Sequence, residues 1–460
     1  MARCCSATTA AIVAPADAKA YADDRDNLRM IRQVMKHMTS QHLSIEAYLD
    51  EESLLRMLEP GEHGELAPCA LLDGEWLLSR AEQIQQCAER EVRTDFALPR
   101  RQQLEKEAPE AFMNAARLRG LERGDERISC PLPLVCVSHI WCTKEHPDPY
   151  GDNLLLLAKS LREARKVERF PAGEFAVFFD WASLHQRDEN GKRTPQEKVA
   201  FKHALSKMQL WYAHMKTLVY LLTATPAEWP ASTVPYHSRG WPSFERMIAM
   251  MIKHQSSKAW ATVCDVGAFA PGGSQRTILQ PPKDVAAFEE MLEHLAFTNG
   301  SDKKMVLSLY RETLSTALKQ APSLRYTGLR WGDQEMADLV KVLPLCRSVK
   351  YLNLKGSRNE YTDKSATLLS NMLLKKGVLP QLKVIGAGCT DKEDRDRDHD
   401  PLLKSDALQH ACKLRGIDLL RDVPFDAVLR SNNMHILNNA VAKRRFRRRR
   451  SSVTYEPHQL

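Results

Sequence analysis

A carboxylate and an aromatic side chain stand four residues apart at the start of a predicted helix. They are Glu245 and Trp241, in the run Ser238–Arg246 (SRGWPSFER), which opens the helical stretch Phe244–His254. Residues four apart lie on one face of a helix, so both side chains can reach one cleft. There a carboxylate can stabilise a developing positive charge, and an indole can stack on a planar base. Arg239, or the free N–H groups at the helix start, could bind a pyrophosphate.

The same run also has a purely structural explanation. Pro242 suits the first turn of a helix, and Glu245 just after it is stabilised by the helix dipole whatever its function. Trp241 can simply fill the gap between a helix and a sheet. From the sequence, Glu245 is either a catalytic group or a helix-start residue.

Short apolar runs before and after this helix predict the sheet that positions it. Strands are expected within Leu132–Trp141, Phe175–Leu184 and Thr217–Thr223, with a fourth in Ala259–Val266. Helical patterns such as Asn153–Phe170 separate the first three runs. Crossover helices between buried strands require a parallel sheet with helices on both faces. The sequence therefore predicts an α/β domain that starts near residue 131.

Polar and aromatic side chains follow two of these strands, where each strand ends. Ser138, His139 and Trp141 end the first strand, and Asp180 and Trp181 end the second. Because the carboxyl ends of parallel strands meet at one edge of a sheet, we expect them to line the same cleft as the helix-start carboxylate. The plainer alternatives are that Asp180 caps the loop after it and that His139 is a structural histidine.

Three blocks in this order resemble the heterokaryon-incompatibility (HET) domain, a family that is similar to the TIR domains of immune signalling. The blocks are Val137–Trp141 (VSHIW), Phe178–Gln186 (FFDWASLHQ) and Arg239–Trp241 (RGW) followed by Glu245. The resemblance implies a flavodoxin-like parallel sheet. It also matches Glu245 with the glutamate that is catalytic in the TIR enzymes that split NAD, while Pro242 stands where TIR has cysteine.

The resemblance implies an intracellular signalling protein that cleaves the nicotinamide–ribose bond of NAD or a related nucleotide. Such cleavage passes through an oxocarbenium-like state, and one carboxylate can stabilise it because nicotinamide is a good leaving group. NAD would be the substrate, and no cofactor is expected. The alternative is a non-catalytic scaffold that self-associates through the α/β domain. The substrate-binding residues expected on this basis are Ser138, His139, Trp141, Asp180, Trp181, Arg239 and Trp241.

Four residues near the first strand have spacings that superficially resemble a zinc site. They are Cys136, His139, Cys142 and His146. Side chains alternate between the faces of a strand, so Cys136 and His139 should point to opposite sides of the sheet. They cannot then share one tetrahedral shell, and no metal site is predicted.

A repeat follows the α/β domain. After Pro271–Gly273, helical patterns from Lys283 to Lys319 lead to three segments that align column by column, Ser323–Leu329, Ser348–Leu354 and Gln381–Ala387. Helical patterns separate these segments. This strand–helix period resembles leucine-rich repeats of the ribonuclease-inhibitor type, which stack their units side by side.

Outward positions of these repeats could bind a protein partner. They are expected at Tyr326, Tyr351, Asn353 and Lys355. A structural lid without a partner is the equal alternative.

The region before the α/β domain has mostly helical spacing and no evident chemistry. Helices are expected in Asn27–Met38, Ile45–Leu58, Glu75–Glu91 and Gln103–Leu121. The predicted organisation is a helical region at 1–130, the HET/TIR-like domain at 131–270, a helical linker at 271–320, the repeat-like segment at 321–425 and a basic tail at 426–460.

Composition and charge limit the partners. Hydrophobic residues make up 43% of the chain and charged residues 27%, as in a globular protein. The net charge is +8, but Lys443–Arg450 (KRRFRRRR) carries seven positive charges, so nucleic-acid binding is indicated at most for the tail. That run is similar to a nuclear-import signal, and a disordered tail that nothing recognises is the alternative.

Cysteine usage and hydropathy indicate the compartment. The 11 cysteines contain no Cys-x-x-Cys pair, which favours free thiols in a reducing compartment. No apolar run approaches the roughly 20 residues that span a bilayer. We therefore predict a cytoplasmic protein, nuclear if the basic tail acts as an import signal, that binds protein partners or copies of itself.

Overall fold

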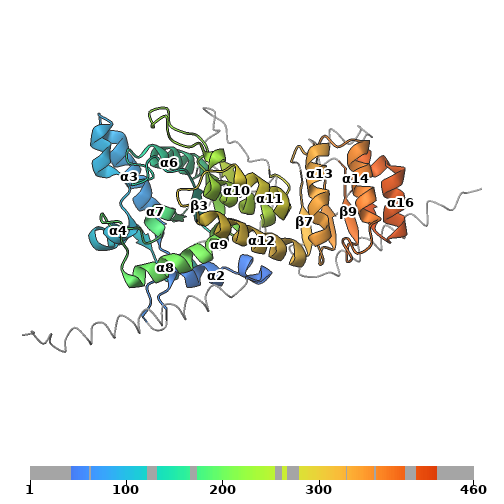
Figure 1. Ribbon diagram of the computed structural model, residues 1–460, viewed down its shortest axis with the longest axis horizontal. Helices are drawn as coiled ribbons and strands as arrows, with labels where there is room; N and C mark the ends of the chain where they lie inside the picture. The colour runs from blue at the N-terminus through green and yellow to red at the C-terminus, as the bar shows by residue number, and fades with distance from the viewer. Residues whose placement is uncertain are drawn as a thin grey trace, which may run out of the picture.

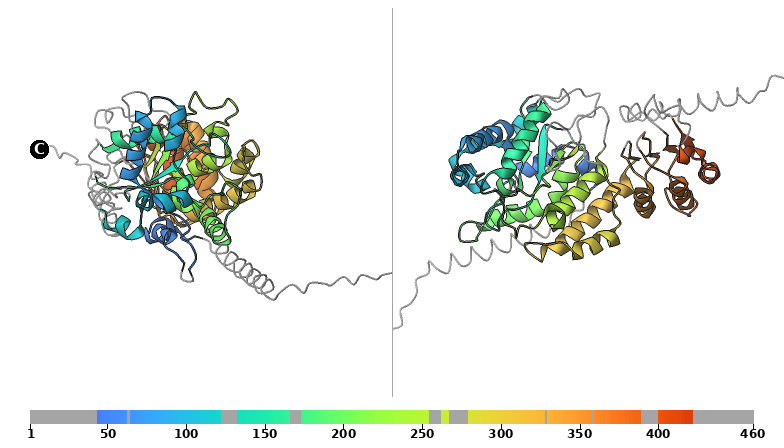
Figure 2. Two further views of the ribbon diagram at one scale, coloured as in Figure 1. Left: turned by 90° about the vertical axis from the view of Figure 1, so that its left-hand side faces the viewer. Right: turned by 90° about the horizontal axis from the view of Figure 1, so that it is seen from above.

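The computed structural model describes residues 43–61, 64–121, 132–165, 173–253, 262–266, 279–327, 329–356, 359–388 and 400–421 (Figure 1). These stretches form a mixed sheet of six strands and a parallel sheet of four. The two sheets lie toward opposite ends of the long axis of the molecule (Figures 1 and 2). Within these stretches, every helix is too short or too polar to cross a lipid bilayer. The predictions made for Asn27–Met38 and Lys443–Arg450 lie outside the described residues.

Four parallel strands form the larger part of the six-stranded sheet, and the α/β prediction is confirmed. The order across the sheet is β4, β3, β5 and β6, and Val135 pairs with both Val177 and Leu218. Each strand is shorter than its apolar run, and the end of the run Phe175–Leu184 forms the short helix α7 (Asp180–Ser183) instead of continuing the strand. The strand bounds are β3 (Leu134–Ser138), β4 (Ala176–Phe178), β5 (Leu218–Leu221) and β6 (Val263–Asp265).

The N-terminal region, which was predicted to be mostly helical, also adds two short antiparallel strands to this sheet. β1 (Leu71–Asp73) pairs with β4 and with β2 (Phe112–Met113). The predicted helix Gln103–Leu121 is interrupted at Pro109 and is replaced by α4 (Arg101–Glu107), β2 and α5 (Ala115–Gly120). Strands of two and three residues are too short to show an alternating pattern in the sequence.

Helices cover both faces of the six-stranded sheet. Val135 and Val177 pack with one set of helices, and Cys136 and Phe178 pack with the other, since side chains alternate along a strand. The first set is α3 (Gly74–Gln86), α6 (Asp152–Arg165) and α7 (Asp180–Ser183), and the second is α8 (Pro195–Ser206), α9 (Met208–Ala213) and α10 (Gly240–Ile252).

The C-terminal unit repeats a strand and a helical segment around a parallel sheet in the order β7, β8, β9 and β10. The three predicted strand positions are confirmed. The fourth strand, β10 (Asp418–Leu420), was not predicted because it is half-exposed and has little apolar pattern. The other elements are β7 (Ser323–Arg325), α13 (Asp333–Val342), β8 (Tyr351–Asn353), α14 (Asp363–Leu373), β9 (Val384–Gly386), α15 (Pro401–Lys404) and α16 (Asp406–Leu414).

Two helices connect the sheets, as the sequence predicts for this segment. They are α11 (Val285–Glu293) and α12 (Asp302–Gln320), and α12 packs against α10. The backbone N–H of Ile45 donates to Gln320 Oε1 at 3.0 Å, so the start of the described chain also rests on α12. The short helices are η1 (Ile45–Tyr48), α2 (Glu52–Leu55), η2 (Arg56–Leu58), η3 (Glu91–Phe96), η4 (Pro109–Ala111), η6 (Tyr236–Ser238) and η7 (Leu343–Leu345).

Candidate functional site

Helix α10 carries the candidate carboxylate against the six-stranded sheet. It begins at Gly240, with Pro242 in its first turn, where a missing N–H costs no hydrogen bond. At its other end the buried Lys253 ammonium donates to the carbonyl of Thr217 at 2.6 Å and to its hydroxyl at 2.8 Å. Burial lowers the pKa of Lys253 to about 7. These bonds attach α10 to the residue before β5.

Glu245 lies in a buried hydrogen-bonded cluster at the carboxyl end of β3. The Ser138 hydroxyl donates to Glu245 Oε2 at 2.6 Å and lies 2.7 Å from the Tyr236 hydroxyl. The Tyr236 hydroxyl also donates to the Pro242 carbonyl at 3.2 Å, and the Tyr212 hydroxyl, which acts to lower the pKa of Glu245, donates to the Val137 carbonyl at 3.1 Å. Neither tyrosine was predicted as a site residue, because its position at the carboxyl depends on packing between distant segments.

Burial decides the charge of this carboxyl group. The Glu245 side chain is 8% exposed, and its desolvation raises the pKa to about 8, although the bond from Ser138 acts to lower it. Glu245 is therefore mainly protonated at neutral pH. A protonated Glu245 can itself donate to Ser138, which leaves the Ser138 hydroxyl free to donate to Tyr236.

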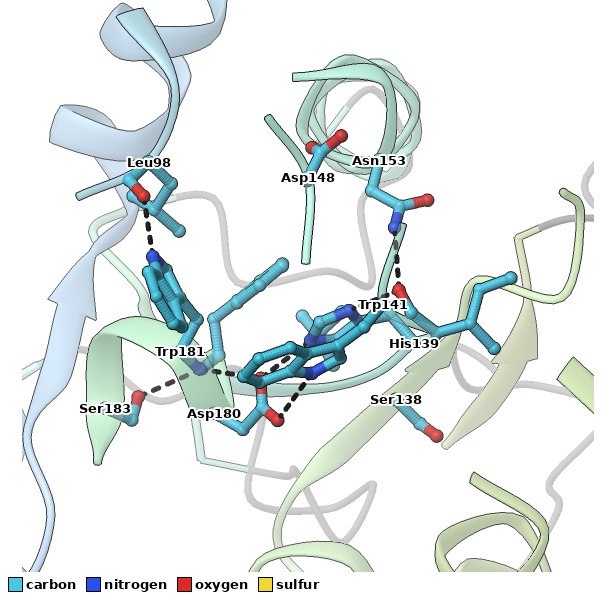
Figure 3. Close-up of polar contacts among 12 residues, drawn as sticks. Leu98, Ser138, His139, Trp141, Asp148, Asn153, Asp180, Trp181 and Ser183 are labelled. Carbon is cyan, nitrogen blue, oxygen red and sulfur yellow. Dashed lines mark hydrogen bonds and ion pairs between the residues drawn. The ribbon is translucent and has the colours of Figure 1, made fainter. Parts of the chain in front are cut away.

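A second cluster joins the ends of β3 and β4 (Figure 3). His139 Nε2 lies 2.7 Å from Asp180 Oδ1, and His139 Nδ1 lies 3.1 Å from the Ile140 carbonyl. Both ring nitrogens face acceptors, and this arrangement favours the imidazolium form, in which both nitrogens donate. Burial disfavours that charge, but the Asp180 carboxylate outweighs it and raises the pKa of His139. Likewise His139 holds the pKa of Asp180 low against its own desolvation.

Two indoles complete the second cluster. Trp141 Nε1 donates to Asp180 Oδ2 at 3.4 Å, and Trp181 Nε1 donates to the Leu98 carbonyl at 2.8 Å (Figure 3). The two rings meet edge to face with centroids 5.4 Å apart. Trp181 thus ties α7 to the N-terminal region, whereas Asp180 remains partly accessible with 27% of its side chain exposed.

The two clusters lie on opposite faces of the sheet, which corrects the expectation of one shared cleft. Ser138 lies on the same face of the sheet as Cys136, which α10 covers. His139 lies on the same face as Val137, which α6 covers. Figure 3 shows the Ser138 hydroxyl turned away from His139. Side chains alternate along an extended chain, so these consecutive residues point to opposite faces, although the charges of Asp180 and His139 still act on the pKa of Glu245.

The predicted substrate-binding groups of α10 are bound by the protein's own chain. Arg239 Nη2 donates to Thr298 Oγ1 at 2.9 Å, and Trp241 Nε1 donates to Asp302 Oδ2 at 3.1 Å. We call residues 296–302, which follow α11 and end at the first residue of α12, the strap. It comes from the predicted helical linker, so the linker contributes directly to this part of the site.

The strap is held against the start of α10 by its backbone. The Gly240 N–H donates to the Ala296 carbonyl at 3.0 Å, and the Ala296 N–H donates to Ser238 at 2.8 Å. The ring of Phe297 lies on Gly240, where an added Cβ would come within 2.0 Å of a ring atom. A glycine is needed at this position because no side chain fits beneath the ring.

Gly240→Ala should therefore displace the Phe297 ring and lower the free energy of unfolding by about 1–3 kcal/mol. In the Gly240→Ala/Phe297→Ala double variant the clash is gone, so its loss should be smaller than the sum of the two single losses. Urea unfolding of the four proteins gives this coupling. Strictly additive losses would show that the ring does not rest on Gly240.

The predicted partner-binding residues of the repeats are mostly buried, so the expectation that they point outward is wrong. Tyr326 is 3% exposed and stacks on Trp331, with ring centroids 4.6 Å apart. Asn353 is 3% exposed, and its side chain accepts the backbone N–H of Lys355 at 3.1 Å. Tyr351 is also buried, and only Lys355 is half-exposed. Ring stacking and turn formation draw these side chains inward.

Further buried polar residues lie close to the second cluster. Asp148 accepts the backbone N–H of Leu154 in the first turn of α6 at 2.9 Å, and burial raises the pKa of Asp148 to about 6. The side chain of Asn153 donates to the Ile140 carbonyl at 3.5 Å (Figure 3). Sequence reasoning missed both residues, although a loop that places Asp148 between two prolines, just before a predicted helix, is a signal for helix capping.

Metal ligation finds no support in the described ranges, where no three His, Cys, Asp or Glu side chains come together. Cys136 packs on the α10 side and His139 on the α6 side, as strand alternation requires. None of the seven cysteines in these ranges forms a disulfide.

Comparison of the chain with protein-family models, with curated proteins and with solved structures gave no match. Function must therefore be argued from the site.

Proposed function

We propose that the chain is an intracellular signalling protein of HET/TIR type and that Glu245 acts on the nicotinamide–ribose bond of NAD or a related nucleotide. The order of the parallel strands supports a flavodoxin-like domain. The four parallel strands lie side by side in the order β4, β3, β5, β6. If they are numbered along the chain, this order is second, first, third and fourth. In such sheets ligands bind beyond the carboxyl ends of the strands.

The observation that carries the proposal is the buried carboxyl group at the end of β3. Glu245 bonds to Ser138 there, and its burial raises its pKa to about 8. An apolar side chain of similar size would avoid the desolvation penalty, so this carboxyl group is not a device for stability. Ionisable groups with strongly shifted pKa values gather at functional sites.

Bound NAD would itself supply a positive charge beside Glu245. The nicotinamide ring of NAD is a cation, and a cation beside Glu245 lowers the pKa of its carboxyl group and favours the ionised form. The carboxylate then stabilises the oxocarbenium-like state as the nicotinamide leaves. Arg239 and Trp241 would reach the pyrophosphate and the base once the strap releases them, so release of the strap would regulate turnover.

Release of nicotinamide tests the proposal. Full-length protein is incubated with NAD, both dilute and at high concentration where it can assemble, and free nicotinamide is measured. Glu245→Gln should lower the rate at least about 100-fold, while Glu197→Gln, a change in the first turn of α8, should not. At low NAD concentration, where the rate reports the free protein, the wild-type rate should rise with pH toward about 8. Equal turnover by wild type and Glu245→Gln would eliminate Glu245 as the acting group.

A non-catalytic scaffold is the second candidate, and one observation favours it. In the described state Glu245 is protonated and hydrogen-bonded, and the strap holds Arg239 and Trp241. Such a domain could self-associate while the leucine-rich-repeat-like unit binds protein partners. Wild-type protein that releases no nicotinamide at any concentration would favour this role.

We also propose that the protein is located in the cytoplasm. Free cysteines support a reducing compartment such as the cytoplasm. Entry into the nucleus would depend on Lys443–Arg450, which lies outside the described residues.

A further inference from the structure

Three exposed leucines lie at or just after the carboxyl ends of helices in the C-terminal unit. Leu345 ends η7 after α13, Leu374 directly follows α14, and Leu414 ends α16. Their exposed fractions are 39%, 51% and 65%. Only six large hydrophobic side chains are exposed in the described ranges, and these three belong to one unit. Leucines that recur at the same end of successive helices form a row rather than isolated surface residues.

Hydrogen bonds show that the three turns are neighbours. Arg347 Nη1, after η7, donates to the Gly377 carbonyl in the turn after α14 at 2.9 Å. Arg415, after α16, donates to the Leu373 and Leu379 carbonyls at 3.0 Å and 2.8 Å. Figure 1 shows α13, α14 and α16 side by side. The three leucines therefore share one edge of the unit, which we call the leucine edge.

Basic side chains surround these leucines. None of the lysines Lys375, Lys376 and Lys413 pairs with a carboxylate of the described residues. Acidic residues begin the same helices at the opposite edge. Lys341 is paired with Asp338 at 2.8 Å. The other exposed basic residues of the leucine edge are Arg347, Lys375, Lys376, Lys383 and Lys413, and the acidic residues that begin the helices are Asp333, Asp363 and Asp406. The unit is thus positive along the leucine edge and negative along the other.

We propose that the leucine edge docks on an anionic lipid bilayer. Cations at helix ends are explained by the helix dipole, but exposed leucines among them are not. The leucines project from turns, so they can enter the headgroup region of a membrane while the lysines contact lipid phosphates. A helical protein partner would need a groove to receive its apolar face, and a bilayer needs none. The opposite, acidic edge would orient the unit with its leucines toward the membrane.

Vesicle binding tests this proposal on the full-length protein. The probes are vesicles of phosphatidylcholine alone and vesicles that also contain phosphatidylserine, measured by co-sedimentation at moderate and raised salt. Wild type should bind the anionic vesicles. Leu345→Ser/Leu374→Ser/Leu414→Ser should weaken that binding at least tenfold, because apolar burial in the bilayer is lost. The matched control, Leu49→Ser/Val92→Ser/Met305→Ser, changes three exposed hydrophobic residues elsewhere and should bind as wild type does.

A charge variant gives a second, independent measurement. Each cation near an anionic surface strengthens binding by roughly fivefold, so Lys375→Glu/Lys376→Glu/Lys413→Glu should abolish binding at moderate salt. The basic run at Lys443–Arg450 is present in every protein compared, and raised salt screens its contribution. Thermal unfolding checks that each variant is folded. The proposal is overturned if folded leucine and charge variants bind like wild type, or if wild type binds no anionic vesicles. The proposal would also be overturned if an acidic amphipathic peptide bound the leucine edge and vesicle binding did not depend on the three leucines.

Discussion

At about pH 9, Glu245→Gln should be more stable than the wild-type protein, with a free energy of unfolding larger by roughly 3–5 kcal/mol. The wild-type carboxyl group must ionise there in a buried position, whereas glutamine carries no charge. At about pH 4 the carboxyl group is protonated in both the folded and the unfolded chain, so the difference should disappear. Urea unfolding across this range measures both limits.

The sign of this effect follows from the direction of the pKa shift. The pKa of Glu245 rises from 4.5 in the unfolded chain to about 8 in the folded protein. Between these values the folded protein binds the proton and the unfolded chain does not, so the contribution to stability falls as pH rises. It is fully present below 4.5 and lost above about 8. Glu245→Gln removes this dependence.

Glu197→Gln is the matched control for this prediction. Glu197 forms a capping box with Thr194 at the start of α8, and its pKa is lowered although desolvation acts to raise it. Its contribution to stability is therefore present above 4.5 and is lost as pH falls. Glu197→Gln should destabilise slightly at neutral pH, the opposite sign. A Glu245→Gln effect that is the same at every pH would show that folding does not raise the pKa of Glu245.

His139→Ala should lower the free energy of unfolding by about 2–4 kcal/mol at neutral pH. It leaves the Asp180 carboxylate, which accepts from the ring at 2.7 Å, beside an empty space. The ring also packs on Phe179, with centroids 4.3 Å apart, and that contact is lost too. The expected loss in the free energy of unfolding is smaller than for a fully buried ion pair, because water reaches part of Asp180.

A double-mutant cycle separates the ion pair from packing. Asp180→Asn keeps the ring contact but removes the charge, and the coupling between the two changes is the energy of the pair. The pKa of His139 is raised above 6.5 and that of Asp180 is lowered below 3.8. The coupling should therefore be largest between those two pKa values and weaken as pH rises above the pKa of His139. Absence of coupling at neutral pH would show that the ring is a neutral packing group.

Local hydrophobic pattern was sufficient for the elements that hold the site. Leu134–Ser138 lies in a short apolar run that ends in polar residues, so a buried parallel strand could be predicted there. The start of α10 could be predicted because Pro242 and the apolar stretch after it agree with a helix. These signals depend on neighbours within one turn or one strand.

The local hydrophobic pattern could not predict which distant segments pair with one another. β1 pairs with β4 although Leu71–Asp73 has only three residues, because the edge of β4 offers unpaired N–H and C=O groups. Tyr326 and Asn353 occupy strand positions expected to face outward. Stacking on Trp331 buries the first, and packing together with a turn bond to Lys355 buries the second. Both contact residues are close in sequence, but the burial of Tyr326 and Asn353 depends on how successive repeats pack together.

The amino-acid sequence by itself determined the parallel strands, the helix that carries Glu245 and the polar residues at the strand ends, since each depends on local patterns. Only the tertiary structure decided that Ser138 and His139 serve opposite faces of the sheet. It also decided that Glu245 keeps its proton and that the strap holds Arg239 and Trp241. Charge state and accessibility depend on which distant segments meet and exclude water, and burial of that kind is a property of the folded chain.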